Sequence, residues 1–206
     1  MKMKIQLSNG MTIKDMDLAG RCAFGMIRND GFIPRHIQRF MEIDRDRRGL
    51  PHIDEPICNH GFQFIWRNGG LHVCEAIAKG VVIRPFMEAY PYGTWHRIVV
   101  YIPEDDMFFQ TFRDGQSVAP AMAQAFCLGA EGKKYRYMNF IWYINDILRN
   151  RAWHGSKDSS KYYCTQLVAA VQNLVYNNFP KAYETTPYEL QIAPNYEAVT
   201  MNYYYE

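Results

Sequence analysis

An Asn-Gly dipeptide between two apolar segments constrains the fold of this chain more than any other sequence feature. The segments run from 60 to 66 and from 71 to 77, with Asn68 and Gly69 between them. Asn-Gly favours a two-residue hairpin turn in which both residues have positive φ. This turn fixes the facing pairs as Trp66 and Leu71, Phe64 and Val73, Phe62 and Glu75, and His60 and Ile77. The sequence therefore predicts an antiparallel hairpin with a defined register.

One face of the predicted hairpin is almost entirely apolar. Because side chains alternate between faces, this face carries Cys58, His60, Phe62, Phe64 and Trp66 together with Leu71, Val73, Glu75 and Ile77. His60 and Glu75 lie diagonally across the two strands, about 7–8 Å apart at the backbone, and side chains can span that separation. A buried carboxylate is costly without a partner. We therefore expect His60 to act as a base that Glu75 orients.

The same residues raise the alternative of a zinc site. Cys58 and His60 on one side, and His72 and Cys74 on the other, are ligand types that structural zinc sites use. In the predicted register, however, His72 and Cys74 face away from Cys58 and His60. We therefore expect neither a metal nor another cofactor, and a register shift of one residue would favour zinc.

Cys164 stands at the beginning of a second well-defined element, a helix. The apolar residues recur at helical spacing on one face: Leu167, Val168, Val171, Leu174 and Val175. We expect this helix to end at Pro180. In the first turn, the helix dipole and the unpaired backbone N–H groups favour a thiolate, so Cys164 is a candidate nucleophile. The alternative is a structural role, because free cysteines are often small core residues.

The remaining pattern changes from strands to helices along the chain. We expect further strands at 3–7, 11–13, 23–28, 81–84 and 97–102, a long polar loop at 45–56, and helices at 34–41, 118–128 and 137–149. The helix at 137–149 should carry Ile141, Ile144, Ile147 and Leu148 on one side, and residues 153–160 should lead to Cys164. The prediction is one α+β domain over residues 1–206, with a small antiparallel sheet or partial barrel packed against helices.

Composition narrows the compartment and the partners. The 206 residues carry a formal net charge of +2, which gives no reason to expect nucleic-acid binding. The N-terminus lacks the apolar core of a secretory signal, and no segment has the roughly 18 apolar residues of a membrane helix. Five cysteines form no framework spacing, which indicates free thiols in a reducing compartment. We expect a soluble, cytoplasmic protein without an integral membrane segment.

Three motifs in this order resemble a known family. His60 comes first, Cys74-Glu75-Ala76-Ile77 follows on the next strand, and Tyr162-Tyr163-Cys164-Thr165-Gln166 begins a late helix. A closing segment, Thr186-Pro187-Tyr188-Glu189-Leu190, fits the same pattern. Together they resemble the permuted papain-like cysteine hydrolases, the YiiX-like branch of the NlpC peptidase superfamily. This chain has Thr165 and Gln166 where the family has a serine and an acidic residue, and His60 directly precedes Gly61.

The resemblance implies a circularly permuted papain-like fold and a catalytic set of Cys164, His60 and Glu75. It implies cleavage of amide or ester bonds through a thioester acyl-enzyme, with cell-wall peptides or lipid amides as substrates. The backbone N–H of Cys164 is a candidate oxyanion donor, and Tyr162, Tyr163 and Gln166 are candidates for a second donor or for substrate contact. Tyr162 and Tyr163 could equally be packing residues. The alternatives are a thiol acyltransferase and a non-catalytic binding module on the same fold.

Overall fold

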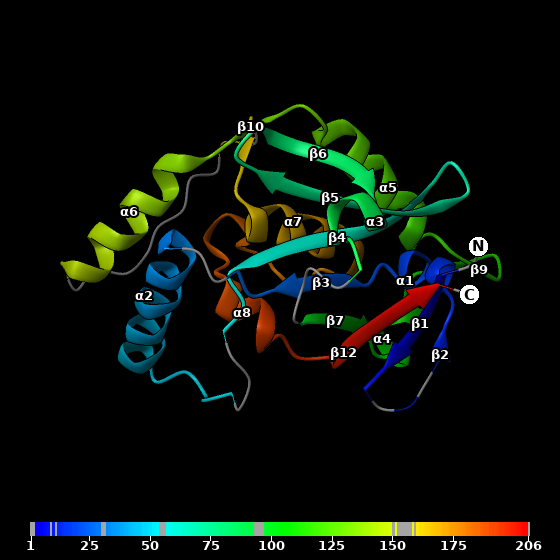
Figure 1. The fold of residues 1–206 in the computed structure, drawn as a ribbon, viewed down its shortest axis with the longest axis horizontal. Coiled ribbons are helices and arrows are strands. Elements are labelled where there is room, and N and C mark those ends of the chain that lie inside the picture. Colours follow the sequence, from blue (N-terminus) through cyan, green and yellow to red (C-terminus); the bar gives the residue numbers. More distant parts are fainter. Residues whose placement is uncertain are drawn as a thin grey trace.

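The computed structural model describes residues 3–8, 10, 12–29, 32–53, 57–92, 97–149, 151, 158 and 160–205. Its main feature is an eight-stranded sheet with the order β2-β1-β12-β7-β3-β4-β5-β6, and every neighbouring pair is antiparallel (Figure 1). The strands are β1 (Met3–Leu7), β2 (Thr12–Ile13), β3 (Phe24–Ile27), β4 (His60–Arg67), β5 (Gly70–Ile77), β6 (Gly80–Pro85), β7 (Ile98–Pro103) and β12 (Tyr196–Tyr205).

Helices and short ladders complete the fold. The helices are α1 (Asp15–Gly20), α2 (Phe32–Arg48), α3 (Phe86–Ala89), α4 (Asp105–Phe109), α5 (Ala119–Ala130), α6 (Tyr137–Leu148), α7 (Cys164–Tyr176) and α8 (Pro187–Gln191), with a 3₁₀ turn η1 (Ala182–Glu184). Two short ladders join β8 (Phe112–Arg113) to β9 (Gln116–Ser117) and β10 (Lys134–Tyr135) to β11 (Lys161–Tyr162). The fold is therefore α+β, as the sequence predicts.

The sheet curls around a largely aromatic and aliphatic core. Strands that are far apart in the sheet order contribute to one buried cluster, including Ile5 of β1, Tyr203 of β12, Phe62 of β4 and Val73 of β5. The opposite face is covered by α5 and α7, whose Leu167 and other apolar residues pack on Ile65 and Cys74. The curl and the covering helices together leave the ends of β4 and β5 next to the beginning of α7.

The predicted hairpin is confirmed in its turn and in its register near the turn. Asn68 and Gly69 have φ values of 52° and 76°, and Trp66 pairs with Leu71 and Phe64 with Val73. Pairing between β4 and β5 ends at Gln63 and Cys74, and the first residues of β4 pair instead with β3, His60 opposite Ile27. Cys58 precedes the strand and packs with Phe24 and Met26. The prediction that it shares the face of Phe62 is therefore wrong.

Several sequence-based predictions need correction. The sheet is not small, because β1 and β12 from the two ends of the chain pair with each other and extend it. The predicted loop at 45–56 is wrong for its first part, since α2 continues through Arg48 with an Asp44–Arg48 pair one turn apart. The helix of Cys164 ends at Tyr176, before Pro180, because Asn177 takes the left-handed conformation.

Two leucines of the predicted apolar helix faces are exposed. Leu174 of α7 is 48% exposed and Leu148 of α6 is 71% exposed, because each helix buries a narrower face than the sequence pattern indicates. On α6 the buried face carries Tyr143 and Ile147, which pack against Met41 of α2. Ile141, Met11 and most of the segment 153–160 lie outside the residues whose side chains are described.

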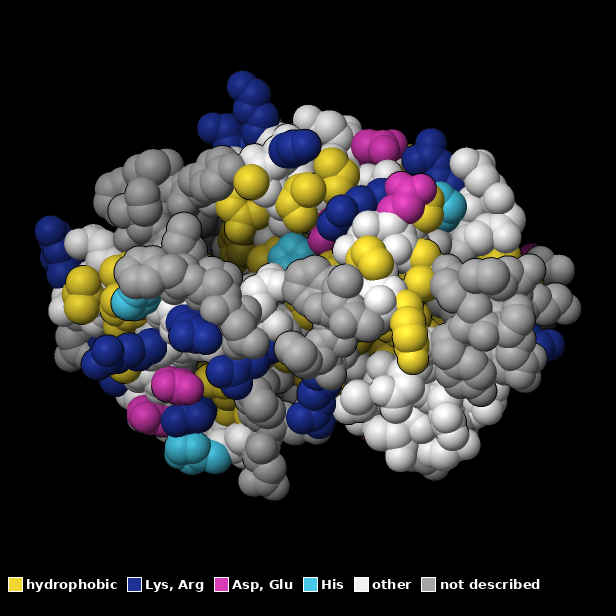
Figure 2. All heavy atoms as spheres, viewed as in Figure 1, with side chains coloured by type: hydrophobic (Ala, Val, Ile, Leu, Met, Phe, Trp, Pro, Cys, Tyr) yellow, Lys and Arg dark blue, Asp and Glu magenta, His cyan; other side chains and the backbone are white. Residues whose placement is uncertain are grey.

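α2 and α6 lie beside each other at one side of the molecule, apart from the curled sheet (Figure 1). Charged side chains of both signs gather over α2 on the face shown in Figure 2. No helix among the described residues is long and apolar enough to cross a membrane.

Gly25 of β3 is required by the packing of Phe62. Gly25 pairs with Phe62 across the strands, and a Cβ at Gly25 would overlap the Phe62 ring. Replacing Gly25 with alanine should therefore lower the free energy of unfolding by about 1–3 kcal/mol, because the ring must leave its place against Tyr90. Urea unfolding measures this change.

Gly20 provides a matched control for this substitution. It lies at the end of α1, and a Cβ there would have no atom within 4 Å. Gly20→Ala should leave the urea midpoint unchanged or raise it slightly. Equal midpoints for the two alanine variants would contradict the role assigned to Gly25.

Candidate active site

Cys164 is the first residue of α7, and its side chain lies at the beginning of β4. Its N-cap is Tyr163 in an extended conformation, and the helix buries Val168 and Val171 against the sheet. In the thiol form, Sγ lies 3.9 Å from the carbonyl oxygen of Asn59. The backbone N–H groups of Gly61 and Thr165 donate to the sulfur when it is charged. The cysteine therefore sits where a thiolate is stabilised.

His60 links Cys164 to Glu75. It is the first residue of β4 and is held in place because the neighbouring Asn59 bonds the backbone N–H of Asn29 through Oδ1 (2.9 Å) and the carbonyl oxygen of Asn29 through Nδ2 (2.8 Å). Its Nε2 lies 2.7 Å from Oε2 of Glu75, and the ring also hydrogen-bonds Cys164. Because Nε2 bonds the carboxylate of Glu75, Nδ1 is the ring nitrogen that is available to bond the sulfur of Cys164.

The electrostatics of this pair favour a thiolate and an imidazolium. Burial opposes the charged forms of both groups, but the hydrogen bond and the charge interaction between them outweigh it. The pKa of Cys164 is consequently lowered from its ordinary value, and the pKa of His60 is raised, with Glu75 adding to the latter shift. Two other described cysteines have raised pKa values. Burial raises the pKa of Cys22 to about 12, and a hydrogen bond with Cys74 together with burial raises the pKa of Cys127.

Glu75 has two partners that the sequence analysis did not identify. Its side chain is 1% exposed. Oε1 accepts a hydrogen bond from Arg84 Nε at 2.7 Å, and Oε2 accepts one from the Tyr90 hydroxyl at 2.9 Å. Burial opposes ionisation, but His60 and then Arg84 outweigh it and lower the pKa of Glu75. The sequence could have indicated Arg84. A tight turn at 78–79 sets Glu75 opposite Val82 and places Arg84 diagonally from Glu75.

The tyrosines next to Cys164 are engaged in packing. Tyr162 is 5% exposed and packs edge-on against Phe126. The hydroxyl of Tyr163 donates to the carbonyl oxygens of Tyr183 and Thr185, both at 3.1 Å. Gln166 is 4% exposed, and within the described residues its Oε1 has no hydrogen-bond partner. These contacts show that both tyrosines pack against their surroundings. The predicted roles of Tyr162, Tyr163 and Gln166 as oxyanion donors or substrate contacts stay predictions.

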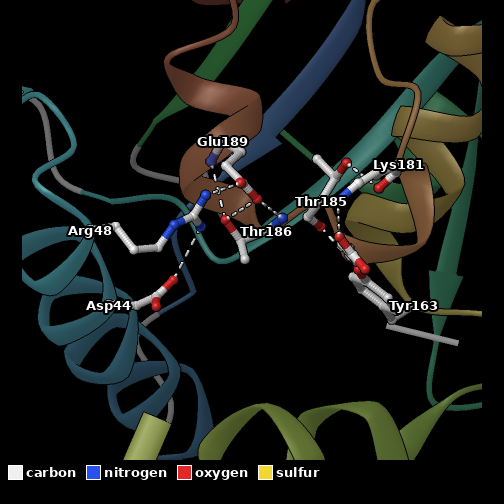
Figure 3. A network of polar contacts seen from close by, with 8 residues as sticks. Asp44, Arg48, Tyr163, Lys181, Thr185, Thr186 and Glu189 are labelled. Carbon is white, nitrogen blue, oxygen red and sulfur yellow. Dashed lines mark hydrogen bonds and ion pairs between the residues drawn. The ribbon is translucent and has the colours of Figure 1, made fainter. Parts of the chain in front are cut away.

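The chain that follows α7 fixes the entry to the helix. Thr165 Oγ1 donates to the carbonyl oxygen of Thr185 at 2.8 Å, and Thr186 forms a capping box with Glu189 at the start of α8. Glu189 in turn binds Arg48 of α2 at 2.7 Å. Figure 3 shows this continuous network from α2 through α8 to Tyr163. The closing segment of the sequence therefore supports the position of Cys164.

A buried amide network holds the middle of α7 on the sheet. Gln172 donates from Nε2 to Gln63 Oε1 at 2.7 Å and to the carbonyl oxygen of Cys22 at 2.9 Å. Its Oε1 accepts the Tyr196 hydroxyl at 2.8 Å. Both glutamines are fully buried, so the network fixes how α7 sits on β4.

The four residues of the alternative zinc site do not converge. Cys74 packs with Cys127 on the face covered by α5, and Cys58 lies in a different cluster. His72 Nδ1 lies 3.0 Å from the carbonyl oxygen of Gly70. Among the residues that the structure describes, no group of three or more His, Cys, Asp and Glu side chains could hold a metal ion.

Known proteins resemble this chain in structure rather than in sequence. No family model matches it, and no curated protein matches it. The crystal structure of the metalloprotein YiiX from Escherichia coli O157:H7 is similar with a TM-score of 0.55 at 15% identity. The match covers 86% of this chain and 94% of YiiX. The chain has a YiiX-like fold. The YiiX-like part of the expected fold is thus confirmed, and the circularly permuted papain-like arrangement stays a prediction.

Proposed function

We propose that the protein is a cysteine-dependent hydrolase of amide or ester bonds. The observation that carries this proposal is the continuous chain from Cys164 through His60 to Glu75, contributed by α7, β4 and β5. A nucleophile, a base and a group that orients the base are the parts that acyl transfer needs. The order of these residues in the sequence, with the cysteine last, supports a circularly permuted papain-like arrangement.

Each residue has a defined step in the proposed reaction. The Cys164 thiolate attacks the carbonyl carbon, and the His60 imidazolium gives its proton to the leaving amine or alcohol, which leaves a thioester. Neutral His60 then takes a proton from water, the water oxygen attacks the thioester, and the thiolate departs. Backbone N–H groups of the first turn of α7, including that of Cys164, lack acceptors within the helix and are suited to bind the oxyanion.

The proposed chemistry indicates a substrate with an amide or ester carbonyl group. Amide and ester carbonyls of cell-wall peptides or lipids remain the predicted substrates. Although YiiX is described as a metalloprotein, the residues here do not fit a metal centre. Both oxygens of Glu75 already accept hydrogen bonds, and no cluster of potential ligands occurs in the described parts of the chain. The proposed steps therefore use side-chain and backbone groups of this chain together with water.

Trapping an acyl-enzyme with p-nitrophenyl acetate tests the proposal. The expected result is a burst of p-nitrophenolate stoichiometric with the enzyme, followed by slower turnover, with acetyl found on the Cys164 peptide by mass spectrometry after an acid quench. His60→Ala should lose the burst. Acetylation that is absent from Cys164, or that persists unchanged in His60→Ala, would contradict the proposal.

A further inference from the structure

Three neighbouring strands place one charged side chain each in a diagonal row. Val73 pairs with Arg84 and Glu75 with Val82, so Arg84 stands diagonally from Glu75 on β6. His60 binds the same carboxylate from β4. Beyond His60 lies Cys164, so positive and negative groups alternate along the row when the thiolate and imidazolium are formed. Arg84 ends this row and has no step in the reaction as proposed above.

The two oxygens of Glu75 are divided between these partners. Oε1 receives Arg84, with Nε at 2.7 Å and an Nη2 contact at 2.5 Å. Oε2 receives both His60 Nε2 at 2.7 Å and the Tyr90 hydroxyl at 2.9 Å. Glu75 is buried, whereas the Arg84 side chain is 36% exposed. A guanidinium keeps its charge at any pH at which the protein is folded.

This permanent charge matters because His60 changes its charge during the proposed reaction. Once the imidazolium has given its proton to the leaving group, the positive partner of Glu75 is gone. Burial then favours the neutral acid, which would draw a proton onto the carboxyl group. Arg84 is the cation that still faces the carboxylate at that stage, and its charge and its hydrogen bonds to Oε1 favour the ionised form of Glu75.

The protonation of Glu75 decides which nitrogen of His60 carries the remaining proton. A carboxylate accepts from Nε2–H and leaves the lone pair of Nδ1 free to take a proton from water. A protonated carboxyl group donates to Nε2 instead, so Nδ1 carries the proton and cannot act as a base. We propose that Arg84 is a positioning residue that keeps Glu75 a hydrogen-bond acceptor and so prepares His60 for hydrolysis of the acyl-enzyme. This inference rests on the proposed function.

Tyr90 reinforces the arrangement from the side. It follows α3 and is fixed by its ring contact with Phe62, with centroids 4.6 Å apart, and by the Tyr203 hydroxyl, which donates to its carbonyl oxygen at 2.9 Å. Burial and the adjacent Glu75 raise its pKa well above the ordinary value, so it stays a donor. Among the described residues, the titratable and charged groups that contact Glu75 are thus His60, Arg84 and Tyr90, with Cys164 acting through His60.

Arg84→Met and Arg84→Lys, assayed with p-nitrophenyl acetate, test the inference. In Arg84→Met the burst should persist, but the rate of the following turnover should fall at least about tenfold. The acid limb of that rate should also move upwards by about one pH unit, the shift expected when a carboxylate loses an adjacent cation. Arg84→Lys should restore most of the rate. Unchanged turnover in Arg84→Met would overturn the inference.

Arg67→Met is the matched control. Arg67 also forms an ion pair, at 3.4 Å with Glu131, and its side chain is 35% exposed, close to the exposure of Arg84. It stands at the turn end of β4, far along the strand from His60, and its loss should change neither burst nor turnover. Equal losses of burst and turnover in Arg84→Met, without improvement in Arg84→Lys, would indicate a merely structural role and overturn the inference.

A measurement that needs no activity separates this inference from the proposed function. In a Cys164→Ala background, ¹⁵N NMR of His60 should show the proton on Nε2 when the ring is neutral, and adding Arg84→Met should move it to Nδ1. If the wild type gives no burst, the proposed function fails, and this spectrum still decides on Arg84. If the proton stays on Nε2 both in Cys164→Ala and in the double variant with Arg84→Met, the positioning role is overturned whatever the kinetics show.

Discussion

Replacing Cys164 with alanine should reduce the turnover of p-nitrophenyl acetate at least about 1,000-fold and abolish the burst, since the proposed thioester forms on its sulfur. The comparison is meaningful because Cys164 lies in the first turn of α7, where alanine keeps the apolar contacts of the helix and removes only the sulfur. Initial rates and the stoichiometry of released p-nitrophenolate measure the effect.

Cys127→Ala controls for the loss of a buried thiol. Cys127 is fully buried on α5 and packs among Cys74 and Ala123, away from His60. The Cys127→Ala variant should be less stable than the wild type because a small cavity is left, but its burst should keep full stoichiometry. If Cys164→Ala retained the burst, or if Cys127→Ala lost it while folded, the assignment of the nucleophile would be wrong.

Replacing Glu75 with glutamine should lower the turnover about 100-fold or more, which is the second largest effect we expect. The amide oxygen can still accept from His60, but it carries no charge to favour the imidazolium and no longer balances Arg84. Burial lowers the pKa of His60, but Cys164 and Glu75 outweigh burial and raise it to about 10. In the variant this pKa should fall. Initial rates between pH 5 and about 10 follow this change.

The loss of free energy of unfolding in Glu75→Gln should depend on pH. The pKa of Glu75 is lowered in the folded protein, because His60 and Arg84 outweigh the effect of burial. Its stabilising contribution is therefore present above the ordinary value of 4.5 and is lost as the pH falls through the folded pKa. The wild type should exceed Glu75→Gln in free energy of unfolding at neutral pH, and the difference should shrink in acid. A difference that grows in acid would contradict the ionised state of Glu75.

Elements with local signals were predictable from the sequence. The Asn68-Gly69 turn fixed the β4–β5 register near the turn, and the apolar spacing of Leu167, Val168 and Val171 marked the buried face of α7. The pairing of His60 with Glu75 also followed, because two adjacent strands bring the two residues together and a buried carboxylate needs a partner. These are interactions within or between segments close in sequence.

Interactions between distant segments were not predictable in this way. β12 pairs with β1 from the other end of the chain, and the alternation of its residues alone does not reveal that partner. Tyr90 reaches Glu75 only because α3 turns the chain back over the sheet. Asn177 could have shown the end of α7, but its left-handed conformation is one of several that asparagine adopts. Tertiary packing decided the first two cases, and a local backbone choice decided the third.

The most direct test of the central claim is the pH dependence of iodoacetamide alkylation at each of the five cysteines, read by peptide mass spectrometry in the wild type and in His60→Ala. All five are buried and none forms a disulfide, so reactivity depends on the thiolate as well as on access. We predict that Cys164 alone reacts well below the ordinary cysteine pKa of 9.0 and that His60→Ala moves its midpoint upwards. If Cys164 is inert, or titrates identically in both proteins, the nucleophile and base assignment is contradicted.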